Sequence, residues 1–421
     1  MSTETTRFGR FNRHGARLGH DCSIRILICA SSAPLPPLDG MRLQVRTLAE
    51  ELARHHEVSV LALRWSDQVD DDGGPGGVDL RTIPAPSRTG AGRMWDRVEA
   101  VVRTRPVGWD RLARSLADEL TSLLAERDFD VVHVVPDDVS GVAPLLDGRP
   151  SVIAPLDARH HNIRAQRYRA SGVHRLWRRQ QERAVRRHLA HALRPFGAAV
   201  FVTDQDAREA QRLDPHVRVA VIPLAIDPAH LVAPSGTGPR DPMRVLFTGV
   251  LAAPANEHAA RRLAVDIMPL VRAELPGARL TLVGRSPSAR LCDLAQRHGV
   301  EVVANVPDLR PWLWRAGAFA CPMAHGTGSK NKLLEAMAAG AAAVATPLAC
   351  RGIRARDGEH LLIAETDREL ATGIVAILRN DDLRRRLGAA GRELVVADHA
   401  PSVVASRYLS LYEQVIAGSR Q

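Results

Sequence analysis

The stretch His325-Gly-Thr-Gly-Ser-Lys-Asn-Lys-Leu-Leu-Glu335 decides how this chain is expected to fold. It follows a short apolar run at Ala318–Cys321, and the apolar residues after it recur with the spacing of one helix face. A strand, a glycine-containing turn and a helix in that order are typical of a parallel α/β sheet. We expect the helix over Asn331–Ala339, with Ser329 as its N-cap and Gly340 at its end.

The two lysines of this stretch, Lys330 and Lys332, are the only lysines in a chain with 57 Lys and Arg residues. An ammonium is a compact point charge, whereas the guanidinium of arginine is a broad planar fork. Free backbone N–H groups of a Gly-x-Gly turn and the positive end of the helix dipole also attract anions. The predicted phosphate site comprises Gly326, Thr327, Gly328, Ser329, Lys330 and Lys332.

Glu335 lies one turn beyond Lys332, so both side chains can point to the same cleft. Its carboxylate could accept hydrogen bonds from the two hydroxyls of a ribose while Lys332 holds the attached phosphates. The alternative is that Lys332 and Glu335 form an exposed ion pair and that the glycines only shape a turn. The local sequence leaves both interpretations open.

The composition indicates two domains in a reducing compartment. A chain of 421 residues exceeds what one hydrophobic core usually supports, and 45% hydrophobic residues suffice for globular packing. The five cysteines are odd in number and lack Cys-x-x-Cys spacing, which argues against a disulfide framework or structural zinc. No apolar stretch approaches the length of a membrane span. We therefore expect a cytoplasmic protein.

A net charge of +10 implies attraction to anions without saying which. Much of the charge lies between Arg159 and Arg194. A solvated arginine-rich helix is the leading interpretation, and weak association with an anionic membrane surface stays open. Aromatic residues make up only 4% of the chain and are not interleaved with these arginines, so no nucleic-acid partner is expected.

Short apolar runs alternate with amphipathic segments through both halves of the chain, as in parallel sheets covered by helices. Strands are expected at Ile24–Cys29, Val58–Leu63, Leu80–Ile83, Val131–Val135, Val152–Ala154, Ala199–Val202 and Val217–Ile222, and then at Val245–Phe247, Arg279–Val283, Val300–Val303, Ala318–Cys321, Ala342–Ala345 and Leu361–Ile363. Helices are expected at Met41–His55, Trp109–Glu126, Ile163–Leu193, Gln205–Leu213, Asn256–Glu274, Ser288–His298, Leu309–Trp314, Asn331–Ala339, Asp367–Arg379, Asp381–Val396 and Pro401–Ile416.

A segment rich in Pro, Gly and Ser at residues 231–243 predicts a linker between two doubly wound domains. The domains would cover residues 23–230 and 244–396, after a disordered basic tail at residues 1–22. Residues 397–421 would form a last helix that can pack back on the N-terminal domain. Two such domains are expected to face a central cleft at the carboxyl ends of their strands, where ligands of these sheets bind.

Two loops of the first half are candidates to line that cleft. After the first strand, Gly40 could approach phosphates, and Asp39 or Arg42 could contact an acceptor; the alternative is that Asp39-Gly40 is only a turn. After the strand Val152–Ala154, Asp157 and His161 could serve as hydrogen-bonding or proton-transfer groups, with His160 as a substitute. Because the chain holds 17 histidines, the alternative for both His160 and His161 is an ordinary surface position.

The second half resembles the C-terminal domain of glycosyltransferase family 4, retaining enzymes of the GT-B architecture, over roughly 170 residues. The motifs that carry the resemblance are Val245-Leu-Phe-Thr-Gly249, Pro254-Ala-Asn256, Leu280-Thr-Leu-Val-Gly-Arg285, Val306-Pro-Asp308 and the segment Pro322–Gly340. Weaker similarity in the first half comes from Pro37-Leu-Asp-Gly-Met-Arg42, His56-Glu-Val58 and Val221-Ile-Pro-Leu-Ala-Ile-Asp227.

The resemblance implies an α/β GT-B fold of two Rossmann-like domains, the first for an acceptor and the second for a nucleotide sugar. It implies that Glu335 binds the ribose and that Lys332, with Lys330, binds the diphosphate. The donor-binding residues implied are Gly40, Gly249, Arg285, Val306, Gly326, Thr327, Gly328, Ser329, Lys330, Lys332, Leu333 and Glu335. The acceptor-binding residues implied are Asp39 and Arg42, and the catalytic ones Asp157, His160 and His161.

Three positions depart from the family pattern. Thr327 stands where the family often has a glutamate, so one acidic contact to the transferred sugar is missing. Asp39-Gly40 replaces a pair of glycines, and no basic residue follows the Val245–Gly249 strand before Arg261. The diphosphate would therefore depend heavily on the two lysines.

The implied activity is transfer of a hexosyl or N-acetylhexosaminyl group from a UDP- or GDP-sugar, ahead of a dTDP-sugar, to a small-molecule, natural-product or lipid-linked acceptor. No cofactor is expected, and no metal, because Asp204-Gln-Asp206 opens a helix and is expected to cap it. Two alternatives remain: a nucleotide-sugar 2-epimerase, which would convert the donor without an acceptor, and a noncatalytic sugar-nucleotide-binding protein, which Thr327 would favour.

Overall fold

The computed structural model describes residues 23–36, 40–66, 68, 74–86, 96–98, 100, 102, 106–156, 163, 172–326 and 330–419. The chain divides into two compact units at the junction between Ile222 and Pro223. This boundary lies upstream of the segment 231–243 in which we expected a linker. The residues from Ala405 onward group with the first unit. The tail at residues 1–22 lies outside the described residues.

Unit 1 contains a seven-stranded sheet with the order β3-β2-β1-β4-β5-β6-β7, in which every pair is parallel. Its strands are β1 (Arg25–Ala30), β2 (Glu57–Arg64), β3 (Asp79–Pro84), β4 (Val131–Val135), β5 (Ser151–Leu156), β6 (Ala198–Phe201) and β7 (Val219–Val221). The central strands are buried along almost their whole length, which is why they read as continuous apolar runs. All seven strands expected in this half are present.

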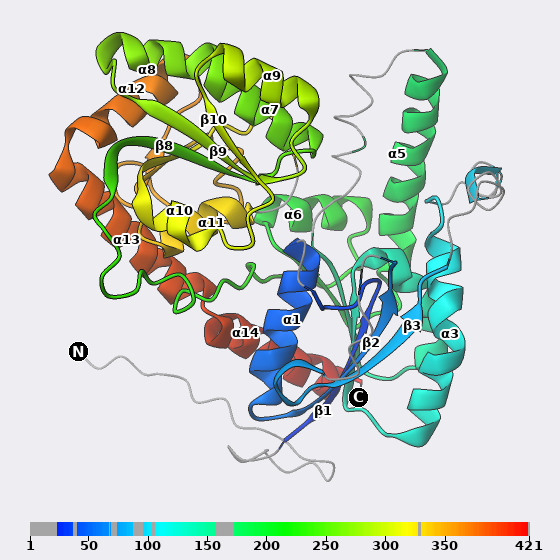
Figure 1. Ribbon diagram of the computed structural model, residues 1–421. Coiled ribbons are helices and arrows are strands. Elements are labelled where there is room, and N and C mark those ends of the chain that lie inside the picture. Colours follow the sequence, from blue (N-terminus) through cyan, green and yellow to red (C-terminus); the bar gives the residue numbers. More distant parts are fainter. Residues whose placement is uncertain are drawn as a thin grey trace. The chain divides into compact units, whose positions relative to one another are not determined.

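The helices of unit 1 connect these strands in the manner of a doubly wound fold (Figure 1). They are α1 (Gly40–Ala53), α3 (Trp109–Glu126), α5 (Gly172–Ala192) and α6 (Asp204–Leu213), with short 3₁₀ segments η1 (Pro75–Gly77) and η2 (Asp137–Leu146). Leu116 and Leu120 of α3 belong to one buried cluster with Leu27, Leu61 and Val132 of the sheet. Burial of each such leucine stabilises the fold by about 1.5–3 kcal/mol.

One local prediction in this unit was wrong. Asp204 and Asp206 lie in the first turn of α6, but the N-cap is Thr203, whose side chain accepts a hydrogen bond from the Asp206 amide. The two carboxylates instead complement the positive end of the helix dipole from inside the first turn.

The last helix, α14 (Pro401–Gly418), attaches to the sheet of unit 1 through a buried polar pair. The Tyr412 hydroxyl lies 2.6 Å from Nδ1 of His133 on β4, and the rings of Tyr408 and Tyr412 both contact the imidazole. Burial lowers the pKa of His133 to about 3, so the ring is neutral at physiological pH. A side-chain carbon at Gly197 would come 2.5 Å from Val415, so the helix approaches closely there.

Unit 2 contains a six-stranded parallel sheet with the order β10-β9-β8-β11-β12-β13. Its strands are β8 (Asp241–Val250), β9 (Arg279–Arg285), β10 (Glu301–Ala304), β11 (Ala316–Cys321), β12 (Ala343–Ala345) and β13 (Leu362–Ile363). Its helices are α7 (Pro254–Arg262), α8 (Met268–Glu274), α9 (Ala289–Arg297), α10 (Arg310–Arg315), α11 (Asn331–Ala338), α12 (Asp367–Arg379) and α13 (Asp381–His399). The α/β fold class expected for both halves is confirmed.

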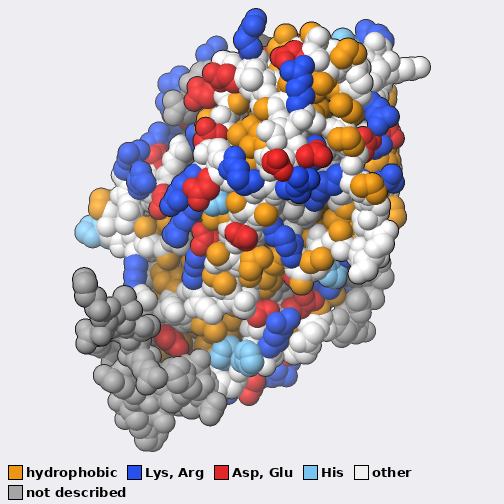
Figure 2. Space-filling model, turned by 90° about the vertical axis from the view of Figure 1, so that its left-hand side faces the viewer, with side chains coloured by type: hydrophobic (Ala, Val, Ile, Leu, Met, Phe, Trp, Pro, Cys, Tyr) orange, Lys and Arg blue, Asp and Glu red, His pale blue; other side chains and the backbone are white. Residues whose placement is uncertain are grey.

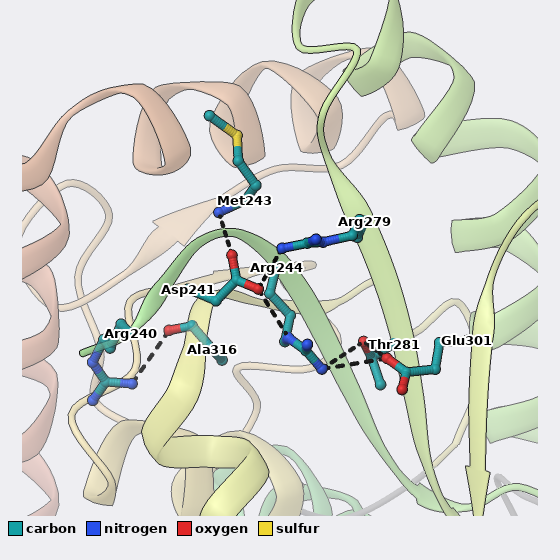
Figure 3. Close-up of polar contacts among 8 residues, drawn as sticks. All are labelled: Arg240, Asp241, Met243, Arg244, Arg279, Thr281, Glu301 and Ala316. Atoms are coloured by element: carbon teal, nitrogen blue, oxygen red, sulfur yellow. Dashed lines mark hydrogen bonds and ion pairs between the residues drawn. The ribbon is translucent and has the colours of Figure 1, made fainter. Parts of the chain in front are cut away.

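Strand β8 begins at Asp241, inside the segment expected to be a linker, because a polar network fixes its first residues (Figure 3). The Asp241 carboxylate accepts hydrogen bonds from the Met243 amide and from the side chains of Arg244 and Arg279. Arg244 reaches on to Thr281, whose hydroxyl donates to Glu301 at 2.8 Å. These contacts tie the amino-terminal ends of β8, β9 and β10 together.

The segment expected to form one helix over Asn256–Glu274 is interrupted. A π-helical turn at Leu263–Ile267 separates α7 from α8, and Pro269 occupies the first turn of α8. Proline has no N–H to give to the preceding turn, so a regular α-helical ladder cannot pass through this position.

On the face drawn in Figure 2, basic side chains are interspersed with acidic and hydrophobic ones. Several arginines of unit 2 pair with neighbouring carboxylates, as Arg279 does with Asp241 and Arg379 with Glu274. Within the described part of the chain, no helix combines the length and the hydrophobicity needed to cross a bilayer.

Candidate functional site

The candidate site lies in unit 2, where three neighbouring parallel strands end. Strand β8 ends in Gly249 and Val250, β9 in Arg285 and β11 in Cys321. Helix α11 follows β11 and starts at the same edge of the sheet. Because the carboxyl edge of an open parallel sheet is where ligands bind, the loops after these strands are the place to look for a site.

Lys332 lies in the first turn of α11, and its ammonium group is held on several sides. Nζ donates a hydrogen bond to Oδ1 of Asn256 on α7. The same atom lies 5.0 Å from the centroid of the Phe247 ring on β8, a cation–π distance. Burial lowers the pKa of Lys332 below its ordinary value, and the nearby Glu335 carboxylate offsets only part of this fall. The positive charge is thus desolvated and directed by its neighbours.

Gly249 makes room for this ammonium. A side-chain carbon at Gly249 would come 3.0 Å from Nζ of Lys332 and 3.0 Å from Nδ2 of Asn256. Its φ of 150° is also one that residues with side chains rarely adopt. A side-chain carbon at Gly284, the neighbour on β9, would come 1.8 Å from the Gly249 carbonyl oxygen. Both glycines are therefore required for the strand ends to lie this close to the lysine.

Asn256 was not among the site residues that we expected from the sequence. It lies in the first turn of α7, and its Nδ2 donates to the Val250 carbonyl at 2.8 Å while Oδ1 accepts from Lys332. The two bonds fix the orientation of the amide and therefore that of the ammonium. The signal that could have indicated it is the Pro254-Ala-Asn256 motif, which we used only to support the family resemblance.

Glu335 follows Lys332 by one helical turn, as the spacing predicts. Burial raises the pKa of its carboxyl group above the ordinary value, and the charge of Lys332 offsets only part of this rise. The mutual electrostatic effect places the two groups in one environment. Both residues are half-buried rather than exposed, which disfavours the alternative of a solvated surface pair.

Lys330 is only 8% exposed and occupies the N-cap position of α11, so the expectation that Ser329 caps this helix was wrong. Its Nζ would lie 3.6 Å from a side-chain carbon at Gly326, whose φ is 114°. Burial raises the pKa of Cys321 to about 11, and both lysines counteract this rise. The two ammonium groups therefore converge near the end of β11.

Three further donor-binding candidates, Leu333, Arg285 and Val306, lie near this edge of the sheet. The Leu333 side chain is fully buried and its amide donates to the Lys330 carbonyl, so Leu333 supports the helix rather than facing outward. Arg285 ends β9, and its carbonyl accepts from Leu251. Val306 follows Asn305, a left-handed residue whose side chain accepts from the Ser286 amide and joins the loops after β9 and β10.

Two predicted residues of unit 1 fall within the described part of the chain. Gly40 is the first residue of α1. Arg42 is 6% exposed, and its Nε donates to the Ser32 hydroxyl at 2.9 Å. The predicted residues that lie outside the described residues are Asp39, Asp157, His160, His161, Thr327, Gly328 and Ser329.

Two family models together match most of the chain. A model described as glycosyl transferases group 1 matches residues 242–380, and one described as glycosyltransferase family 4 matches residues 38–230. The chain belongs to glycosyltransferase family 4. The enzyme class expected from the sequence, a glycosyltransferase, is confirmed at the level of this family, and the resemblance extends to the first half of the chain.

Curated relatives of this family member are mannosyltransferases. The phosphatidyl-myo-inositol mannosyltransferase of Mycobacterium tuberculosis is 34% identical over 191 residues, which cover 43% of this chain and 49% of the relative. The chain thus matches about half the length of this relative. The protein of the same name from Mycolicibacterium smegmatis is 26% identical over 405 residues, covering 92% of this chain and 93% of the relative.

Solved structures support the fold of this family member. Sucrose-phosphate synthase from Thermosynechococcus elongatus aligns with a TM-score of 0.71 at 18% identity, covering 94% of this chain and all of the other. The Anabaena protein HepE, solved with UDP and glucose, aligns with a TM-score of 0.64 at 12% identity over 93% of this chain and 100% of HepE. Identities this low establish only the GT-B fold.

Proposed function

We propose that this family member is a retaining, metal-independent glycosyltransferase that moves a hexose from a nucleotide sugar to a lipid-linked or small-molecule acceptor. The observation that carries the proposal is the Lys332 ammonium, held beside Gly249 by Asn256 at the start of α11. A desolvated, oriented cation at a sheet edge is suited to bind the diphosphate of a nucleotide sugar.

The lysines would act on the leaving group. In the transfer, the bond from the anomeric carbon to the β-phosphate oxygen breaks, and a bond to the acceptor oxygen forms. The acceptor hydroxyl loses its proton, and a nucleoside diphosphate leaves. Negative charge grows on the phosphate as the first bond breaks, so fixed positive charge from Lys332 and Lys330 stabilises the transition state. Two ammonium groups supply this without a divalent ion.

Other residues would hold the rest of the donor. The Glu335 carboxylate would accept hydrogen bonds from the ribose hydroxyls, as carboxylates do when ionised. Gly326, Thr327, Gly328 and Ser329 would offer backbone amides to the phosphates. UDP- and GDP-sugars are the first donors to test, followed by dTDP-sugars.

The acceptor proposal rests on the curated relatives, which are named for transfer of mannose to phosphatidyl-myo-inositol. We infer a lipid-linked acceptor with a polyol headgroup and a mannosyl donor as the first pair to assay. Asp39 and Arg42 would contact the headgroup, and Asp157, His160 and His161 would orient the acceptor hydroxyl and the sugar. Small-molecule polyols are the second acceptor class.

A product assay tests the proposal. The protein is incubated with each nucleotide sugar, with and without inositol phospholipid, in the presence of EDTA, and the products are separated by chromatography. The proposal expects nucleoside diphosphate and glycolipid to form together, with the anomeric configuration of the donor kept in the product. An epimerised donor without acceptor would identify an isomerase, and activity that required added manganese would overturn metal independence.

Binding without turnover on every acceptor would instead indicate a noncatalytic sugar-nucleotide protein. A thermal-shift screen of nucleotides and sugar nucleotides identifies the donor first, because a ligand that binds only the native state raises its melting temperature. Glu335→Ala should reduce the part of the shift that depends on the ribose. Equal shifts in this variant would place the ribose elsewhere.

A further inference from the structure

Unit 1 contains a cavity of about 730 Å³. Residues of helices α3 and α5, both labelled in Figure 1, and of the segment η2 line it. Its volume lies in the range of small-molecule sites, which is about 300–1,000 Å³. It shares no residue with the site around Lys332, so neither the proposed function nor its tests depend on it.

Small side chains on all three elements create the hollow. The ones that line it are Ala113 and Ala117 of α3, Gly141 and Ala143 of η2, and Ala184 and Ala192 of α5. A side-chain carbon at Gly141 would come 2.8 Å from that of Ala113, so η2 already packs tightly under α3 at this point. Elsewhere the small residues leave open a largely apolar space, which suits a hydrocarbon chain better than a polar metabolite.

One part of the cavity wall is held in place by an ordered contact. The His188 ring of α5 packs edge-on against Trp109 of α3, with ring centroids 4.6 Å apart. Its Nε2 lies 2.8 Å from the Ser140 hydroxyl of η2. All three residues line the cavity, so a side chain from each element fixes the separation of the walls. The cavity is therefore a formed feature of the unit.

The charged lining is mostly basic. Arg114 and Arg187 line the cavity, against a single carboxylate from Asp110. Arg187 is exposed, and within the part of the chain that the structure describes no carboxylate forms an ion pair with it. A guanidinium pairs well with a phosphate or carboxylate group. An apolar space with a basic border is complementary to an anion that carries an alkyl chain.

We propose that this cavity, formed by α3, η2 and α5, binds an amphipathic anion, with its alkyl chain along the alanine-lined walls and its anionic group at Arg187. A single-chain lipid phosphate and a fatty acid share this chemistry. The choice of probes separates the two contributions: dodecyl phosphate carries chain and charge, dodecanol only the chain, and inorganic phosphate only the charge.

The test is calorimetric titration of the full chain with these probes below their micellar concentrations. We expect dodecyl phosphate to bind, with affinity rising roughly threefold to fourfold for each methylene in a series from octyl to dodecyl phosphate. Ala117→Phe fills the cavity from a half-exposed position, so the fold should tolerate it, and we expect it to abolish binding of dodecyl phosphate and dodecanol alike.

Arg187→Ala should weaken dodecyl phosphate about tenfold and leave dodecanol unchanged. The matched control is Arg186→Ala, because Arg186 is exposed on the same helix but does not line the cavity. Unchanged binding in Ala117→Phe, or no binding of dodecyl phosphate to the unaltered protein, would overturn the proposal. An equal loss in Arg186→Ala and Arg187→Ala would overturn it too, because general attraction to α5 would then explain the binding.

Discussion

Lys332 on α11 donates a hydrogen bond to Asn256 on α7, although the two residues lie 76 positions apart in the chain. Asn256 is itself fixed by its bond to the Val250 carbonyl. The amide therefore determines where the ammonium points. Asn256 is thus a positioning residue for the group that we propose binds the diphosphate.

Replacing Asn256 should weaken the nucleotide without removing the lysine. A hydrogen bond of this kind contributes about 1 kcal/mol, so Asn256→Ala should raise the dissociation constant of the preferred nucleoside diphosphate roughly fivefold. Asn256→Asp should lower affinity further, because its carboxylate competes with the phosphate for Lys332. Calorimetry measures both. Arg261→Ala, an exposed change on the same helix, is the control and should leave the affinity unaltered.

Gly249→Ala should reduce both stability and nucleotide affinity. The added methyl group would meet the Lys332 ammonium and the Asn256 amide, and overpacking of this kind costs about 1–3 kcal/mol. Gly277→Ala is the matched control, because a side-chain carbon there meets nothing within 4 Å. Thermal melts with and without nucleotide compare the two. A Gly249→Ala protein that melts and binds like the control would show that the close approach has no role.

Nucleotide affinity should fall at high pH, and Lys332 should account for much of the fall. Burial lowers the pKa of Lys332 below its ordinary value of 10.5, and a bound diphosphate would raise it again. The full affinity is then present below the pKa that Lys332 has in the free protein. It is lost as the pH rises through the pKa that Lys332 has in the complex. Titrations between pH 7 and 10 should show this loss. The same pH profile in Lys332→Met would assign it to another group.

The bond between His133 and Tyr412 should be a main attachment of α14 to unit 1. Tyr412→Phe leaves a buried ring nitrogen without its partner, which costs about 1–3 kcal/mol. The double variant His133→Leu with Tyr412→Phe removes both polar groups and should recover part of the loss. Chemical denaturation measures the free energies of unfolding. A Tyr412→Phe protein as stable as the unaltered one would show that this hydrogen bond is not a main attachment of α14.

Acid should destabilise the protein partly through the same histidine. The pKa of His133 is lowered by burial from 6.5 to about 3 in the folded chain, so only the unfolded chain takes up its proton between these values. The stability it contributes is present above pH 6.5 and falls below it by roughly 1.4 kcal/mol per pH unit. His133→Leu should flatten this part of the stability profile. An unaltered slope would contradict the assignment.

The sequence predicted the regular elements well because their signals are local. The strand Val131–Val135 and the helix Trp109–Glu126 have the expected bounds, since apolar runs and helical spacing are read within one segment. The π-helical turn before Pro269 was missed, although proline is a known signal for such a break. Segment η2, which contains Pro144, has no periodic pattern and was not expected either.

The candidate site was only partly accessible from the sequence. Lys332 and Glu335 could be found because both lie on one helix behind a glycine turn. Asn256 was marked only by the Pro254-Ala-Asn256 motif, because its role comes from the pairing of α7 with α11, which no spacing within the chain encodes. No spacing encodes the pairing of His133 with Tyr412 either, which are 279 positions apart. Contacts between distant elements become visible only once the fold is known.

The most direct test of the central claim is the dissociation constant of UDP and of GDP at neutral pH for the unaltered chain and for Lys332→Met. Loss of a charge-assisted hydrogen bond costs about 1.5–3 kcal/mol, so we expect at least one nucleotide to bind and the variant to bind it roughly 10- to 150-fold more weakly. Equal affinity in the two proteins, or no binding of either nucleotide to the unaltered chain, would contradict it.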